Sequence, residues 1–259
     1  MDLLVVDRVV KNFGGLRVLN QASLVVKKGT VTALVGPNGS GKTTLFNVIY
    51  GLTPADEGEV YFRGKKITRY PPYQIYREGL ALAFQLPRLF NQLPIMDNLL
   101  LAAPVNSGEN PLRALFTRPR WQEEERALAR QAREVLELLE LTPLALRPAG
   151  QLSGGQRKLV EIGRVLMAKP EMILVDEPAA GINPVLARKI YATLKKLQQE
   201  KGLTLFVIEH RLEVLFDFAD YVYLMDAGRV VLEGTPEEVL AHPDFYTIYA
   251  GESRPWRVL

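Results

Sequence analysis

The chemically most informative segment of the sequence is rich in glycine and ends in a lysine and a threonine. Residues 36–43 read Gly-Pro-Asn-Gly-Ser-Gly-Lys-Thr and fit the phosphate-loop pattern G-x-x-x-x-G-K-[ST]. The glycines let the backbone curl so that successive N–H groups face one anion at the start of a helix. Lys42 can then reach the β- and γ-phosphates of a nucleotide, and the Thr43 hydroxyl can ligate Mg²⁺. The predicted nucleotide-binding residues of this loop are Gly36, Pro37, Asn38, Gly39, Ser40, Gly41, Lys42, Thr43 and Thr44.

Two carboxylates end a second apolar strand. The strand is predicted over Met172–Val175, and Asp176 and Glu177 follow it directly. Asp176 is expected to hold Mg²⁺, directly or through water, because this ion prefers oxygen ligands. Glu177 projects one residue further and can polarise an attacking water. Together with the phosphate loop, this pair predicts hydrolysis of a nucleoside triphosphate.

A second glycine-rich helix start precedes the acidic strand. Leu152-Ser153-Gly154-Gly155-Gln156-Arg157 opens a helix predicted over Lys158–Ala168. Its amino end is a further anion-binding site, but one nucleotide does not need two such cradles from one chain. The second cradle is therefore predicted to serve a γ-phosphate held by another subunit.

The elements that position these residues predict an α/β fold. Strands are expected at Leu3–Val6, Ser23–Val26, Val31–Val35, Met172–Val175, Leu205–Ile208 and Tyr221–Met225, and helices at Lys42–Tyr50 and Pro184–Gln199. Residues 94–147 contain no strand candidate, and 121–141 form an amphipathic helix pattern. We interpret residues 1–259 as one domain, with an α/β core (1–85 and 161–259) and a helical subdomain (86–160) that carries the Ser-Gly-Gly segment. The polar segment 103–120 is assigned no function.

Composition excludes several classes of protein. The 259 residues include 32 Lys and Arg against 29 Asp and Glu, and a net charge of +3 is too small for a nucleic-acid footprint. The sequence has no cysteine, which excludes a disulfide framework and a thiolate metal site. It has only two histidines, too few for a histidine-rich metal centre. No signal peptide or membrane-spanning run is recognisable, which predicts a cytosolic protein that reaches a membrane through a partner.

The hexapeptide 152–157 resembles the signature of ATP-binding-cassette (ABC) ATPases, and the whole chain is similar to that family. The resemblance implies a P-loop NTPase fold with a RecA-like core, an antiparallel β subdomain and an inserted α-helical subdomain. It also implies roles for residues that could not be interpreted alone. Phe13 resembles the aromatic that stacks on adenine, with Val18 sharing the contact. Gln85 resembles the glutamine that contacts Mg²⁺ and senses a transmembrane subunit, and His210 resembles the histidine that reaches the γ-phosphate.

The same resemblance implies an ATPase that works as a head-to-tail dimer with two MgATP at the seam. One chain would supply Lys42, Gln85, Glu177 and His210 as catalytic residues and Thr43, Gln85 and Asp176 as Mg²⁺ ligands. Its partner would supply Ser153, Gly154, Gly155 and Gln156. Two departures from the family pattern are Asn183, where many members carry aspartate, and Gly163, where alanine is expected inside the signature helix.

Features outside the ATP site resemble one subgroup of cassettes. The segments 13–16, 180–184 and 242–252 are similar to the first of two ATPase subunits of branched-chain amino-acid importers. This implies a second, different ATPase, two permease subunits, an extracytoplasmic solute-binding protein and a peripheral position on the cytoplasmic face of the membrane, with no nucleic-acid partner. The alternatives are an amide- or urea-type importer, lipopolysaccharide export, and a non-transport cassette acting on nucleic acid or the ribosome.

Overall fold

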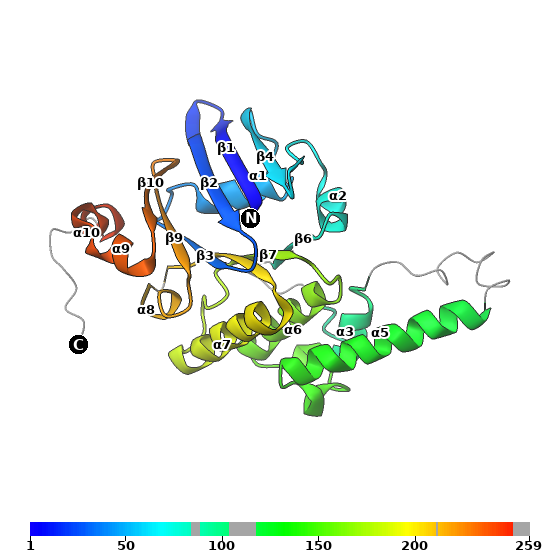
Figure 1. Cartoon of the computed structure of the whole chain (residues 1–259). Coiled ribbons are helices and arrows are strands. Elements are labelled where there is room, and N and C mark those ends of the chain that lie inside the picture. Colours follow the sequence, from blue (N-terminus) through cyan, green and yellow to red (C-terminus); the bar gives the residue numbers. More distant parts are fainter. Residues whose placement is uncertain (84–88, 104–117, 211, 251–259) are drawn as a thin grey trace. The chain divides into compact units, whose positions relative to one another are not determined.

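The computed structural model describes residues 1–83, 89–103, 118–210 and 212–250 (Figure 1). The chain divides into two compact units, Met1–Leu82 with Glu171–Leu259, and Ala83–Pro170. The sequence interpretation placed these boundaries after residues 85 and 160. Residue 160 lies inside a continuous helix, α6 (Gly154–Leu166), and for this reason the second boundary follows the helix. Among the helices of the described ranges, none is long and apolar enough to cross a bilayer.

The first unit is built around a mainly parallel sheet with strand order β10-β9-β3-β8-β7-β6. The strands are β3 (Val31–Val35), β6 (Leu80–Ala83), β7 (Met172–Asp176), β8 (Thr204–Ile208), β9 (Tyr221–Asp226) and β10 (Arg229–Gly234). β3 and β8 are buried along their whole length, which explains their uninterrupted apolar sequences. β3, β7 and β8 are parallel neighbours, so their carboxyl ends meet at one edge of the sheet.

A second, antiparallel sheet has the strand order β2-β1-β4-β5. Its strands are β1 (Asp2–Phe13), β2 (Leu16–Lys27), β4 (Glu57–Phe62) and β5 (Lys65–Lys66). The sequence predicted only four-residue segments of β1 and β2, which was wrong in length. The β1–β2 register shifts at several points and Arg8 has φ 47°, and these irregularities interrupt the alternation on which strand prediction depends.

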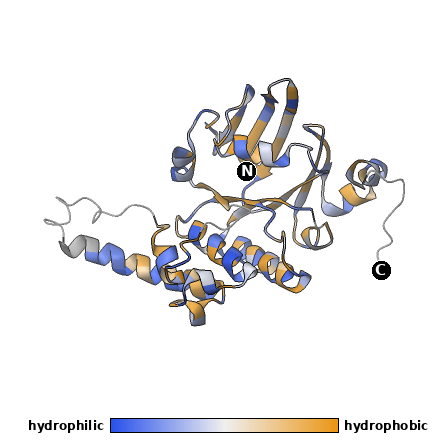
Figure 2. Ribbon diagram, turned by 180° about the vertical axis from the view of Figure 1, so that it is seen from behind, coloured by the Kyte–Doolittle hydropathy of each residue, from blue (hydrophilic) through white to orange (hydrophobic). Residues whose placement is uncertain are grey.

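Helices complete the first unit. They are α1 (Lys42–Ile49), α2 (Pro72–Arg77), α7 (Pro184–Lys201), α8 (Leu212–Leu215), α9 (Pro236–Ala241) and α10 (Pro243–Ala250). α1 packs on the sheet through Phe46, whose ring centroid lies 4.9 Å from that of Phe206 in β8. Figure 2 shows apolar residues on both strands and helices, and those of β3 and β8 are buried. This apolar core fixes the strand ends that carry the site residues.

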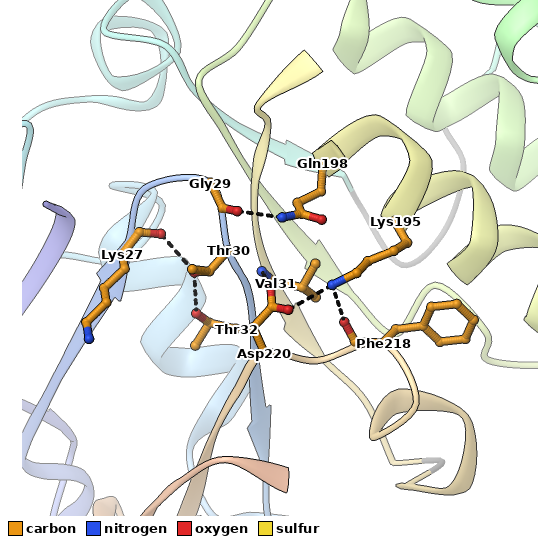
Figure 3. Close-up of polar contacts among 9 residues, drawn as sticks. All are labelled: Lys27, Gly29, Thr30, Val31, Thr32, Lys195, Gln198, Phe218 and Asp220. Atoms are coloured by element: carbon orange, nitrogen blue, oxygen red, sulfur yellow. Dashed lines mark hydrogen bonds and ion pairs between the residues drawn. The ribbon is translucent and has the colours of Figure 1, made fainter. Parts of the chain in front are cut away.

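A polar network ties α7 to the amino ends of the parallel strands (Figure 3). Lys195 Nζ donates to Asp220 Oδ1 at 2.8 Å and to the Phe218 carbonyl at 3.2 Å. Asp220 Oδ2 accepts from the Val31 amide at 2.7 Å, and Gln198 donates to the Gly29 carbonyl at 2.6 Å. The network lies at the start of β3, whereas the phosphate loop follows the end of β3, so we assign it a structural role.

The second unit is helical in its described part. It contains α3 (Ile95–Leu100), α5 (Arg118–Leu138), α6 and the short 3₁₀ helices η2 (Thr142–Leu144) and η3 (Ala149–Gln151). Ala132, Val135, Leu136 and Leu139 are buried, as the amphipathic pattern predicted. The buried Asn98 side chain accepts from the Phe90 amide and donates to the Phe90, Leu93 and Pro94 carbonyls, which secures the turn before α3.

Candidate functional site

The glycine-rich loop joins β3 to α1 at the carboxyl edge of the parallel sheet. Gly36 has φ 150°, and a Cβ there would lie 2.1 Å from the Met225 carbonyl oxygen. Gly41, with φ 104°, is the N-cap of α1, and a Cβ there would lie 2.8 Å from the Val18 carbonyl oxygen. Since neighbouring backbone occupies both positions, only glycine fits. No side chain caps α1, so its first-turn N–H groups are left to a ligand or solvent.

Lys42 is held inside the loop that precedes it. Its ammonium group donates to the carbonyls of Gly36 and Pro37, both at 2.8 Å, and to Ser40 Oγ at 3.3 Å. Burial lowers the pKa of Lys42, while the charges of Glu177 and Asp176 act in the opposite direction. The loop therefore concentrates one buried positive charge beside two carboxylates.

Asp176 ends β7 with one carboxylate oxygen that has no protein partner. Oδ1 is buried and makes no hydrogen bond within the described residues. Burial and, secondarily, the charge of Glu177 raise the pKa of Asp176 to about 6, although His210 and Lys42 oppose the shift. An unsatisfied carboxylate oxygen in an acidic environment matches the donor chemistry of a hard divalent cation such as Mg²⁺. No group of three or more His, Cys, Asp or Glu with metal-site geometry occurs among the described residues, so protein ligands alone would not enclose such an ion.

Glu177 and His210 form a pair across the ends of β7 and β8. His210 Nε2 lies 2.9 Å from Glu177 Oε1. Glu177 has φ 48°, a left-handed conformation that is uncommon for a residue with a side chain. Its amide donates to the Ile208 carbonyl at 3.0 Å, and its carbonyl accepts from the Ala180 amide at 3.1 Å. The backbone bonds thus maintain a strained conformation at a candidate functional residue.

Glu209 is a buried residue of this site that the sequence analysis missed. Its side chain is 2% exposed, and its two oxygens accept from the amides of Ala179 (3.0 Å) and His210 (2.7 Å). Glu209 thereby connects the segment after Glu177 to the segment that carries His210. A signal was present, because Glu209 follows a buried strand directly, as Asp176 and Glu177 do.

Phe13 and Val18 lie near the closed end of the β1–β2 hairpin. The Phe13 side chain is 51% exposed, and Lys11 Nζ lies 5.5 Å from its ring centroid. Lys11 is itself held by Asp56 Oδ1 at 2.8 Å. Val18 places its carbonyl against Gly41 of the loop. An exposed aromatic ring and the phosphate loop thus belong to the same unit.

The second glycine-rich segment lies in the other unit, at the start of α6. Ser153 caps this helix in a reciprocal arrangement with Gln156. The Gln156 amide donates to Ser153 Oγ at 3.4 Å, and the Ser153 amide donates to Gln156 Oε1 at 3.0 Å. Gly154 and Gly155 form the first turn, and a Cβ on Gly154 would meet nothing within 4 Å. Gln85, another predicted site residue, lies outside the described residues.

Asn183 acts as the N-cap of α7. Its side-chain oxygen accepts from the Leu186 amide at 2.9 Å, and Pro184 occupies the first helical position. The amide oxygen performs the same capping that an aspartate would provide. The departure from the family pattern is therefore compatible with the local fold.

Fold and site together define a class: a P-loop nucleoside triphosphatase with a glycine-rich loop, an acidic strand end and an adjacent histidine on one sheet edge. Comparison with known proteins narrows this class. The family model described as "ABC transporter" matches residues 19–180. The probable branched-chain amino acid transport ATP-binding protein LivG of Methanocaldococcus jannaschii is 44% identical over 256 residues, covering 97% of this chain and 98% of the relative.

Two further similarities agree. The high-affinity branched-chain amino acid transport ATP-binding protein BraF of Pseudomonas aeruginosa is 35% identical, covering 97% of this chain and 98% of the relative. A crystal structure of the ADP conformation of an ATP-binding cassette from an ABC transporter superposes with a TM-score of 0.84 at 42% identity, covering 97% of this chain and all of that chain. The chain belongs to the ABC transporter ATP-binding family and is an ATPase.

Proposed function

We propose that this chain is the ATP-hydrolysing subunit of an importer for branched-chain amino acids, bound peripherally to permease subunits on the cytoplasmic face of the membrane. The observation that carries the proposal is its relationship, over nearly its whole length, to two proteins named as ATP-binding proteins of branched-chain amino acid transport. The site residues relate to nucleotide chemistry, and therefore the proposed cargo rests on this relationship alone.

The phosphate loop and the β1–β2 hairpin are proposed to bind the substrate ATP. The Lys42 ammonium exchanges the Gly36 and Pro37 carbonyls for oxygens of the β- and γ-phosphates, supported by the N–H groups at the start of α1. The exposed ring of Phe13 stacks on the adenine, with Val18 beside it. The fixed positions of Lys11 and Asp56 keep the hairpin end in place for this contact.

Glu177 is proposed to orient the attacking water and His210 to orient Glu177. The 2.9 Å contact between His210 Nε2 and Glu177 Oε1 fixes the direction of the carboxylate. A carboxylate so held can accept a hydrogen bond from a water aligned with the γ-phosphate. His210 also provides a donor near the γ-phosphate, and Lys42 offsets charge on its oxygens.

Residues of the site also fit Mg²⁺. Asp176 offers a buried oxygen without a protein partner, and we propose Thr43 and Gln85 as the other ligands. When bound, Mg²⁺ neutralises negative charge on the phosphate oxygens. Asp176 must be ionised for this role, and because its pKa is raised to about 6, protons compete with Mg²⁺ for this carboxylate more strongly than at an ordinary aspartate.

We propose that the segment Ser153–Gln156 completes the site of a partner cassette. The amino end of α6 favours negative charge, and Ser153 carries a hydroxyl at that end. Lys42 and Glu177 already belong to one nucleotide site in the first unit, so a head-to-tail dimer uses both cradles. The partner is a second cassette, and a different chain where the importer carries two kinds of ATPase.

A purification from native membranes with an affinity tag on this chain tests the function. Co-purification of two membrane-spanning proteins and a second cassette, with ATP-dependent uptake of leucine, isoleucine or valine, is the expected result. Uptake should disappear in the Glu177→Gln variant. Uptake of amides or urea, or co-purification of lipopolysaccharide-export components, would contradict the cargo. Co-purification of ribosomes or nucleic acid without membrane proteins would contradict transport itself.

A further inference from the structure

The backbone of His210 is fastened by a residue from the far end of the chain. The hydroxyl of Tyr249 in α10 donates to the His210 carbonyl oxygen at 2.7 Å. On the other side, the His210 amide donates to the buried Glu209 carboxylate at 2.7 Å. Hydrogen bonds therefore hold the peptide groups on both sides of the His210 Cα. The His210 side chain contacts Glu177 from a backbone whose position is fixed.

We propose that Tyr249 is a positioning residue for ATP hydrolysis, which acts through the His210 backbone to hold the imidazole against Glu177. The inference rests on the proposed role of His210. Through this contact, α10 would influence the ATP site, although the helix begins 33 residues after His210 in the sequence.

The Tyr249 ring is itself immobilised by packing. It stacks on Phe245 with ring centroids 5.7 Å apart and planes 9° apart. Phe245 is completely buried and also contacts Phe216, at a centroid distance of 6.1 Å. Because the ring is held by packing, its hydroxyl has a fixed position. Forming the hydrogen bond to His210 therefore costs little conformational entropy.

The chemistry of the hydroxyl suits a permanent donor. Burial, followed by the charge of Glu209, raises the pKa of Tyr249 to about 12. The hydroxyl therefore keeps its proton over the working pH range, and a backbone carbonyl is an acceptor at any pH. The contact is a constant support and not a pH switch.

The test compares Tyr249→Phe with the matched control Tyr246→Phe in the full-length chain. Both variants keep an aromatic ring in α10. Tyr246 contacts Phe245 edge-on at a centroid distance of 5.3 Å, and its hydroxyl has no hydrogen-bond partner within the described residues. Tyr249→Phe should reduce kcat roughly fivefold with little change in the KM for ATP, because one hydrogen bond to the His210 backbone is lost. Tyr246→Phe should retain the wild-type kcat.

A double variant distinguishes the positioning role of Tyr249 from the role of His210 on which it rests. In a His210→Ala background, Tyr249→Phe should cause no additional loss of kcat if it acts through the imidazole. An equal fold-loss in both backgrounds, or a lower Tm with unchanged kcat, would overturn the positioning role. If His210→Ala itself keeps the wild-type kcat, the proposed role of His210 fails, and the inference fails for that separate, recognisable reason.

Discussion

The Lys42 ammonium group is hydrogen bonded to the phosphate loop that precedes it. Its contacts to the carbonyls of Gly36 and Pro37 keep the loop closed around a buried charge. Lys42→Ala removes both the internal bonds and the contact to phosphate. We expect ATP affinity to fall by roughly 10- to 100-fold, the range of one to two charge-assisted hydrogen bonds. Calorimetric titration measures this, with the exposed Lys201→Ala as control. Unchanged affinity would contradict the phosphate-binding role.

Asp176 gives the ligand-free protein a defined pH dependence. Its pKa in the folded state, about 6, lies above the ordinary value of 3.8, so folding favours the protonated form. This contribution to stability is complete below pH 4 and is lost as the pH rises to about 6. Asp176→Asn should therefore raise Tm above pH 6, and the gain should vanish toward pH 4. Thermal scans between pH 4 and 8 without nucleotide test this, with Asp2→Asn as control. A gain in Tm that does not depend on pH would exclude the ionisation of Asp176 as the cause of the gain.

At the scale of elements, Gly163 shows why a helix interior can require glycine. A Cβ there would lie 2.9 Å from Cδ1 of Leu139, the residue after α5, and 3.0 Å from Cδ2 of Leu99 in α3. Gly163→Ala gains about 1 kcal/mol of helix propensity but overpacks this contact by about 1–3 kcal/mol. We expect a net loss of about 1 kcal/mol in urea unfolding. Gly154→Ala, whose Cβ would meet open space, should be neutral or stabilising. An increase in the free energy of unfolding in both variants would contradict the packing argument.

The sequence predicted those elements whose cause is local. Glycines at Gly36 and Gly41 mark close backbone approach, and the apolar runs of β3, β7 and β8 identify buried parallel strands. The irregular hairpin β1–β2 was underestimated, because its bulges hide the alternation, and β6 and β10 were not predicted. At the site, the position of Glu209 after a buried strand was a usable signal, but its bond to the distant Ala179 amide was not predictable from local sequence. Tyr249 has no local signal, because its hydroxyl bonds the carbonyl of His210, which is 39 residues away in the sequence.

At the scale of the whole molecule, the two cradles predict nucleotide-dependent association. The Glu177→Gln variant should bind ATP but hydrolyse it very slowly. Two ATP-bound chains should therefore stay associated, and a dimer should accumulate on gel filtration with MgATP. The dimer should be absent without nucleotide, and in the double variant with Lys42→Ala it should require a higher MgATP concentration, because that substitution weakens ATP binding. ATPase activity near the wild-type value in Glu177→Gln would contradict the assignment of Glu177 as the residue that orients water.

The pairing of β3 also has a consequence for biosynthesis. Among the described strands, β3 pairs with β8 and β9, which come much later in the chain, and the Ser40 carbonyl of the phosphate loop accepts from the amide of Gly228 at 3.0 Å. A ribosome-bound chain that ends before β8 lacks both neighbours of β3. The loop precedes Gly228 in the chain, so we expect it to acquire its final shape only when the segment through Gly228 has emerged. We therefore expect a nascent chain that ends before β8 to lack a loop able to bind ATP.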